Sequence, residues 1–153
     1  MEKYILVSYS DALARVKYLR KSIRDLEAKL ERMEEPGYYV TDTVTKGRKG
    51  KKSLGNVTVS GFPRQSYNHT RHMLAIRKKQ MEKEEQKLLE LTNEAEEYIS
   101  SIGNIEIRNI LSLYYIEDLN WVQVAHRMNE MYGGKEYTES SCRQKHERFL
   151  KKI

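Results

Sequence analysis

Residues 118–153 read DLNWVQVAHRMNEMYGGKEYTESSCRQKHERFLKKI, and this stretch decides the fold of the last third of the chain. Asn120 ends a polar turn and caps a helix, and Gln123, three residues later, completes a capping box. Gly133-Gly134 ends that helix, and Thr138 caps another that runs to the C-terminus. The stretch therefore predicts two helices joined by a turn.

The last of these helices has an apolar face and a polar face. Spacings of 4, 3 and 4 predict a buried stripe made of Cys142, His146, Phe149 and Ile153. Short polar groups in the first turn, followed by Arg and Gln, suit a major-groove helix, because Arg pairs bidentately with guanine and Gln with adenine. We therefore predict that DNA is contacted by Ser140, Ser141, Arg143, Gln144, Lys145, Arg148, Lys151 and Lys152.

A third helix precedes the turn. Residues 105–115 place apolar side chains at helical spacing, and the helix after Asn120 does the same. Three short helices with complementary apolar faces predict a helix-turn-helix domain over residues 104–153. The expected core residues are Ile107, Ile110, Leu111, Tyr114, Trp121, Val124, Ala125 and Met128.

A resemblance to a known family is carried by Ile107-Arg108-Asn109-Ile110-Leu111, Tyr114-Tyr115-Ile116, Trp121-Val122-Gln123-Val124-Ala125, Ser141-Cys142-Arg143 and Glu147-Arg148-Phe149-Leu150. With these residues, the helices resemble the region-4 helix-turn-helix of bacterial sigma-70 factors, in the form found in small bacteriophage-encoded transcription regulators of the RinA and ArpU types. The resemblance implies that residues 138–152 lie in the major groove, and that the protein contacts RNA polymerase or recruits it to a phage or prophage promoter. It departs from the family because 17 positions separate Ala125 from Cys142, against roughly ten usually.

Residues 1–103 predict a helical, coiled-coil-like arm. From about Ser10, apolar residues recur at alternating spacings of 4 and 3 up to Met33, and Pro36-Gly37 ends this helix. A second helix is predicted from near Tyr67 to Ile102, with an apolar residue at every seventh position. Two helices bury their seams best against another copy, so we expect a homodimer through the arm.

A β-hairpin is predicted at about 38–63, between the two helices of the arm. Two runs with a period of two flank a Gly- and Lys-rich tip, and residues 36–72 carry seven Lys and Arg against one Asp. The tip is either a solvated loop or an arm that binds phosphate. Its candidate phosphate contacts are Lys46, Arg48, Lys49, Lys51 and Lys52.

The composition of the chain limits the classes of function that fit it. Charged residues make up 33% and hydrophobic residues 39% of the 153 residues, and the net charge of +6 suits a polyanionic partner. The single cysteine fits a cytoplasmic protein, and no run of apolar residues is long enough to span a membrane. No nucleophile motif or Gly-rich phosphate loop is present, so we expect no enzymatic activity, catalytic residue, metal or cofactor.

The sequence predicts a mainly α fold: a long antiparallel helical hairpin with a small β-hairpin insertion, followed by a three-helix domain. The leading functional hypothesis is a sequence-specific regulator that binds double-stranded DNA. Two alternatives stay open. One is a protein-interaction module that binds RNA polymerase or another protein, and the other is a phage DNA-packaging protein similar to a small terminase.

Overall fold

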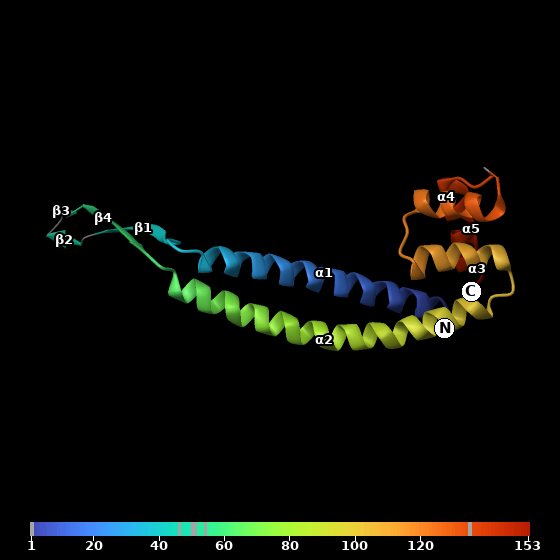
Figure 1. Ribbon diagram of the computed structural model, residues 1–153, viewed down its shortest axis with the longest axis horizontal. Coiled ribbons are helices and arrows are strands. Elements are labelled where there is room, and N and C mark those ends of the chain that lie inside the picture. Colours follow the sequence, from blue (N-terminus) through green and yellow to red (C-terminus); the bar gives the residue numbers. More distant parts are fainter. Residues whose placement is uncertain (1, 46, 50–51, 54, 135) are drawn as a thin grey trace. The chain divides into compact units, whose positions relative to one another are not determined.

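The computed structural model describes residues 2–45, 47–49, 52–53, 55–134 and 136–153, and their fold is mainly helical, as predicted (Figure 1). Within these ranges no helix combines the length and the apolar content that crossing a bilayer requires. The elements are α1 (Glu2–Glu34), β1 (Val40–Thr45), β2 (Arg48–Lys49), β3 (Lys52–Ser53), β4 (Asn56–Gly61), α2 (Arg64–Ser101), α3 (Ile105–Leu111), the π-helix η1 (Ser112–Ile116), α4 (Trp121–Tyr132) and α5 (Glu139–Lys152).

The first long helix starts earlier than predicted. We expected its start at Ser10, but α1 already includes Leu6 and Tyr9, which are 0% and 4% exposed. Burial of these two side chains stabilises the extra turns, because each removes a large apolar surface from water. The end agrees with the prediction: α1 stops before Pro36, and Gly37 has a φ of 81°, a left-handed conformation that favours glycine.

The chain forms two compact units. The first unit consists of residues 1–17 and 82–153, and the second unit of residues 18–81. The sequence predicted a division after residue 103. The compact units are divided elsewhere, because the start of α1 and the end of α2 share a core with the C-terminal helices. The buried members of this shared core are Leu6, Tyr9, Ala95, Ile99, Leu111 and Tyr115.

The second unit pairs the later part of α1 with the earlier part of α2, joined by the β-strands. The predicted heptad seam of α1 is buried here at Leu19, Leu30 and Met33. At the hairpin end the Tyr67 hydroxyl donates a hydrogen bond to Glu34 over 2.7 Å. This bond ties α2 to the last residue of α1, where both helices meet the strands.

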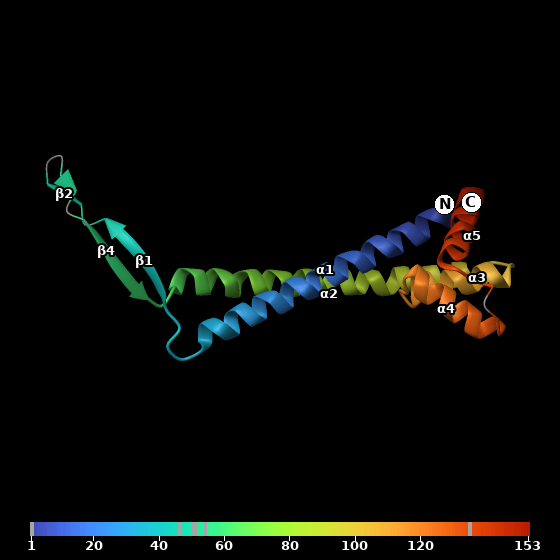
Figure 2. The same ribbon diagram turned by 90° about the horizontal axis from the view of Figure 1, so that it is seen from above.

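The predicted β-hairpin is present in the second unit. β1 and β4 pair antiparallel in a register from Val40 opposite Gly61 to Thr45 opposite Asn56. Figure 2 shows the arrows of β1 and β4 running in opposite directions. β2 and β3 form a second short antiparallel pair toward the tip. The hairpin is therefore a two-stranded ribbon, which alone is marginally stable in water.

The C-terminal helices of the first unit form the predicted helix-turn-helix core. Asn120 and Gln123 make the predicted capping box, in which the Gln123 N–H donates to Asn120 over 2.9 Å and the Asn120 N–H donates to Gln123 over 3.0 Å. Gly133 ends α4 with a φ of 65°. The buried residues of the core are Ile110, Leu113, Val124, Ala125, Met128 and Cys142.

An aromatic cluster fixes α5 against the rest of the first unit. The rings of Tyr114 and Trp121 stack with centroids 4.1 Å apart, and the imidazole of His146 lies within 5.6 Å of three rings. His146 is 8% exposed and hydrogen-bonds the Tyr115 hydroxyl over 2.8 Å. Burial raises the pKa of Tyr115 to about 12, so Tyr115 keeps its proton at neutral pH. In contrast to these buried groups, Ile153, which we expected in the buried stripe, is 37% exposed beyond the end of α5.

The buried imidazole should make folding stability depend on pH. Burial lowers the pKa of His146, with Glu147 opposing the shift, so below about pH 6.5 the unfolded chain binds more protons than the native chain. The free energy of unfolding should therefore fall as the pH drops through 6.5. Urea denaturation at pH 7.5 and 5.5 measures this loss, and His146→Asn should reduce it. An equal loss in both proteins would contradict the assignment to His146.

Candidate nucleic-acid interface

The helix α5 is fixed at its start by a second capping box. Thr138 is the N-cap, its hydroxyl accepts from the Ser141 N–H over 3.1 Å, and its own N–H donates to the Ser141 hydroxyl over 2.9 Å. The cap was predicted from Thr138, but its reciprocal partner Ser141 was assigned to DNA. The Ser141 hydroxyl turns back to the cap and also donates to the Thr138 carbonyl over 3.1 Å. Its hydrogen bonds are thus made within the protein.

The outward face of α5 carries most of the predicted DNA contacts. Cys142 and His146 are buried on the inward side, at 0% and 8% exposure. A helix that buries one stripe turns the opposite residues to solvent. The predicted contact residues that are exposed on α5 are Ser140, Arg143, Gln144, Arg148, Lys151 and Lys152.

An acidic residue that was not predicted as part of the site shares this face. Glu147 is exposed and lies four residues from both Arg143 and Lys151, a spacing that places helical side chains side by side. A carboxylate here either accepts from a cytosine amino group or repels phosphate. The spacing of four residues that places Glu147 beside Arg143 and Lys151 on a helix can be read from the sequence. The predicted buried stripe of Cys142 and His146 already placed Glu147 on the opposite side of the helix, where the structure exposes it.

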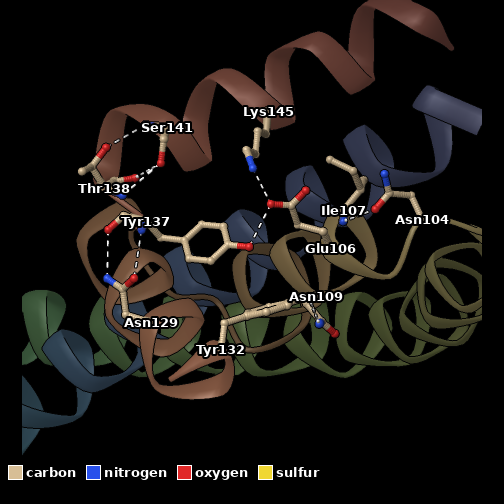
Figure 3. A network of polar contacts seen from close by, with 10 residues as sticks. All are labelled: Asn104, Glu106, Ile107, Asn109, Asn129, Tyr132, Tyr137, Thr138, Ser141 and Lys145. Carbon is tan, nitrogen blue, oxygen red and sulfur yellow. Dashed lines mark hydrogen bonds and ion pairs between the residues drawn. The ribbon is translucent and has the colours of Figure 1, made fainter. Parts of the chain in front are cut away.

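Lys145 is held by the protein itself. Its Nζ donates to Glu106 Oε1 on α3 and lies 5.2 Å from the centre of the Tyr137 ring (Figure 3). The Tyr137 hydroxyl donates to the same oxygen over 2.8 Å. These contacts lower the pKa of Glu106, with the Lys145 hydrogen bond as the largest cause. Glu106 is therefore a carboxylate on α3 that binds a cation of α5.

Tyr137 is the second hydrogen-bond donor to Glu106, and its surroundings keep its hydroxyl protonated. Burial, followed by the hydrogen bond to Glu106, raises the pKa of Tyr137. The phenol thus stays protonated and donates its hydrogen. Because a donor and a cation both meet Glu106, the ionised carboxylate is the stable form in the folded protein.

The turn between α4 and α5 is long, and side-chain hydrogen bonds hold the residues on either side of it. The 17 positions between Ala125 and Cys142 exceed the usual spacing, and part of the excess is taken up by α4, which continues to Tyr132. The Asn129 amide then accepts from the Tyr137 N–H and donates to the Tyr137 carbonyl, each over 2.9 Å (Figure 3). Asn109 donates to the Tyr132 hydroxyl over 3.2 Å. These hydrogen bonds hold Tyr132 and Tyr137, which lie on either side of the turn.

The predicted phosphate contacts of the β-hairpin belong to the second unit. Lys46 and Lys51 lie outside the described residues. Arg48 and Lys49 form β2, and Lys52 begins β3. Whether this tip contacts phosphate stays a prediction.

Chemically, α5 offers hydrogen-bond donors that suit base edges and phosphates. Arg143 presents a planar guanidinium, and Gln144 presents an amide that both donates and accepts. Lys151 and Lys152 add point charges near the end of the helix, where cations also interact favourably with the helix dipole. The Cys142 thiol is buried and burial raises its pKa, which keeps it an unreactive core group.

The comparisons with known proteins identify a family whose function is not known. None of the curated proteins and none of the solved structures matches this chain. One family model, described as "Protein of unknown function (DUF1492)", matches residues 49–138, from the tip of the β-hairpin to the N-cap of α5. Because this match covers more than half of the 153 residues, the chain belongs to the DUF1492 family.

Proposed function

We propose that this protein is a non-enzymatic, sequence-specific regulator of transcription that reads the major groove of double-stranded DNA with α5. The observation that carries the proposal is the exposure of Ser140, Arg143 and Gln144 near the start of a helix whose opposite side is buried. Such a helix presents its first turns to base edges while its core stays packed. The resemblance to phage-encoded regulators supports a phage or prophage origin, and a DNA-bound role is a cytoplasmic one.

Phosphate contacts would accompany base contacts. Arg148, Lys151 and Lys152 are exposed further along α5, where the backbone walls of the groove would run. Such contacts fix the register of a protein on the duplex without reading sequence. The basic tip of the β-hairpin is a further candidate for this role.

The DNA-reading role predicts a selective effect at Arg143. Arg143→Ala should cost about 1–3 kcal/mol on a duplex selected from random oligonucleotides, because a bidentate contact to guanine is lost. Arg127→Ala, which removes an exposed arginine from α4, is the matched control and should cost much less. Fluorescence anisotropy with selected and random duplexes measures both. Equal losses for Arg143→Ala on the two duplexes would contradict base reading.

A second candidate function is binding to bacterial RNA polymerase. The observation that favours it is the exposure of two apolar side chains of α4, Val122 at 62% and Met131 at 56%. Exposed apolar residues on a small domain are common at protein contacts. The two functions are compatible, since α4 and α5 present different surfaces.

Substitution on α4 separates the two functions. Val122→Glu should abolish co-elution with purified polymerase, because it places a charge in an apolar contact, and should leave duplex affinity within about twofold. Arg127→Glu, which introduces a carboxylate at an exposed position of the same helix, is the matched control. Unchanged co-elution of Val122→Glu would argue against this surface.

We also propose a homodimer through the helical arm. In the first unit, a groove of about 440 Å³ runs between α1 and α2, and its apolar walls include Tyr4, Val7 and Leu91. Tyr4 is 72% exposed and Val7 47%. The groove also contains Asp11, Arg15, Glu84 and Lys87, so both signs of charge are present, which allows ion pairs between two copies related by a twofold axis.

The dimer predicts a position-dependent loss of association. Val7→Glu should raise the dissociation constant at least tenfold in analytical ultracentrifugation, because it introduces a charge into the apolar part of the groove. Leu89→Glu is the matched control, since Leu89 is 63% exposed and does not line the groove. A wild-type protein that sediments as a monomer at high micromolar concentration would rule out this interface.

A further inference from the structure

We propose that Glu106 is a charge-masking residue, which holds Lys145 in a neutral internal pair and so removes one cation from the surface that meets DNA phosphates. The inference rests on the proposed function of α5. It corrects the expectation that Lys145 itself contacts DNA. It also gives α3 a part in setting how strongly the protein binds DNA of any sequence.

The position of Lys145 makes this masking necessary. Lys145, Arg148 and Lys152 follow one another at i, i+3 and i+7 and all line one cleft of about 340 Å³ between α3 and α5. Ile107 and Phe149 contribute apolar walls to this cleft. Without Glu106, the flank of α5 would therefore present three neighbouring cations to a polyanion.

The structure stabilises the ion pair between Lys145 and Glu106 in two ways. The side chains of Lys145 and Glu106 are 36% and 32% exposed, so the pair is partly removed from the solvent screening that weakens fully exposed ion pairs. The carboxylate oxygen that receives Lys145 also receives the Tyr137 hydroxyl. Asn129 fixes the backbone of Tyr137 through two hydrogen bonds, so Glu106 has a fixed donor independent of Lys145.

Masking has a measurable consequence for DNA binding. A cation that contacts phosphate displaces a condensed counterion and steepens the dependence of log K on log salt by about 0.9 per contact. A lysine that stays paired with a carboxylate displaces none. Glu106 would then lower affinity for all DNA sequences and leave the base contacts of α5 to determine where the protein binds.

The test compares three variants of the full chain on a random-sequence duplex at several salt concentrations. Glu106→Gln removes the negative charge but keeps an amide oxygen that accepts from Tyr137. Glu106→Gln combined with Lys145→Met replaces the whole pair by neutral groups. Glu130→Gln makes the same charge change on α4, where Glu130 pairs with His126 and not with α5.

We expect Glu106→Gln to steepen the salt slope by about 0.9, while Glu130→Gln and the double variant keep the wild-type slope. Elution from heparin, a polyanion without base edges, should also shift to higher salt for Glu106→Gln alone. A Glu106→Gln slope equal to that of Glu130→Gln would overturn the proposal. A double variant with a flatter slope than wild type would also overturn it, because Lys145 would then already contact phosphate.

These outcomes differ from a failure of the proposed function. If the wild-type protein shows no preference for any selected duplex, sequence-specific regulation is wrong, yet the slopes on random duplex and the heparin elution still decide the role of Glu106. Thermal unfolding of each variant shows that the slopes belong to folded protein.

Discussion

The packing of Cys142 and His146 against the helix-turn-helix core is the constraint on which the proposed DNA-binding surface depends. A helix can in principle rotate about its axis, but burial of these two residues fixes the orientation of α5. The aromatic rings of Tyr114 on η1 and Trp121 on α4 hold the imidazole in place. Once the inward side is fixed, Arg143 and Gln144 must face solvent. The chemistry offered to a partner is thus a consequence of core packing.

Structure set by neighbouring residues could be predicted from the sequence. The caps at Asn120 and Thr138 each need only a partner three residues away, and both capping boxes form. The ends of the helices at Pro36 and Gly133 follow from the backbone limits of proline and glycine. The start of α1 could not be predicted, because it depends on Leu6 and on partners about 90 or more positions further along the chain.

The candidate site shows the same distinction between local and distant partners. The pattern of α5 identified which residues are polar, but not which polar groups the protein uses internally. Ser141 serves the cap three residues before it, and a capping box at Thr138 could have been recognised from the sequence. Lys145 pairs with Glu106, 39 residues away on another helix, and only the packing of α3 against α5 brings them together.

The near balance of charge in residues 104–153, with eight Lys and Arg against seven Asp and Glu, gives a misleading impression of a neutral surface. Several acids are engaged within the fold: Glu106 with Lys145, Asp118 with Lys17 and Glu130 with His126. Cations of α5, in contrast, are exposed along its outward side. If α5 binds DNA as we propose, such a surface would attract the polyanion only weakly, and contacts that need a specific geometry would contribute a larger share of the binding energy. Weak general attraction combined with a rigid donor face is the arrangement that discriminates between sequences, because unspecific binding competes less.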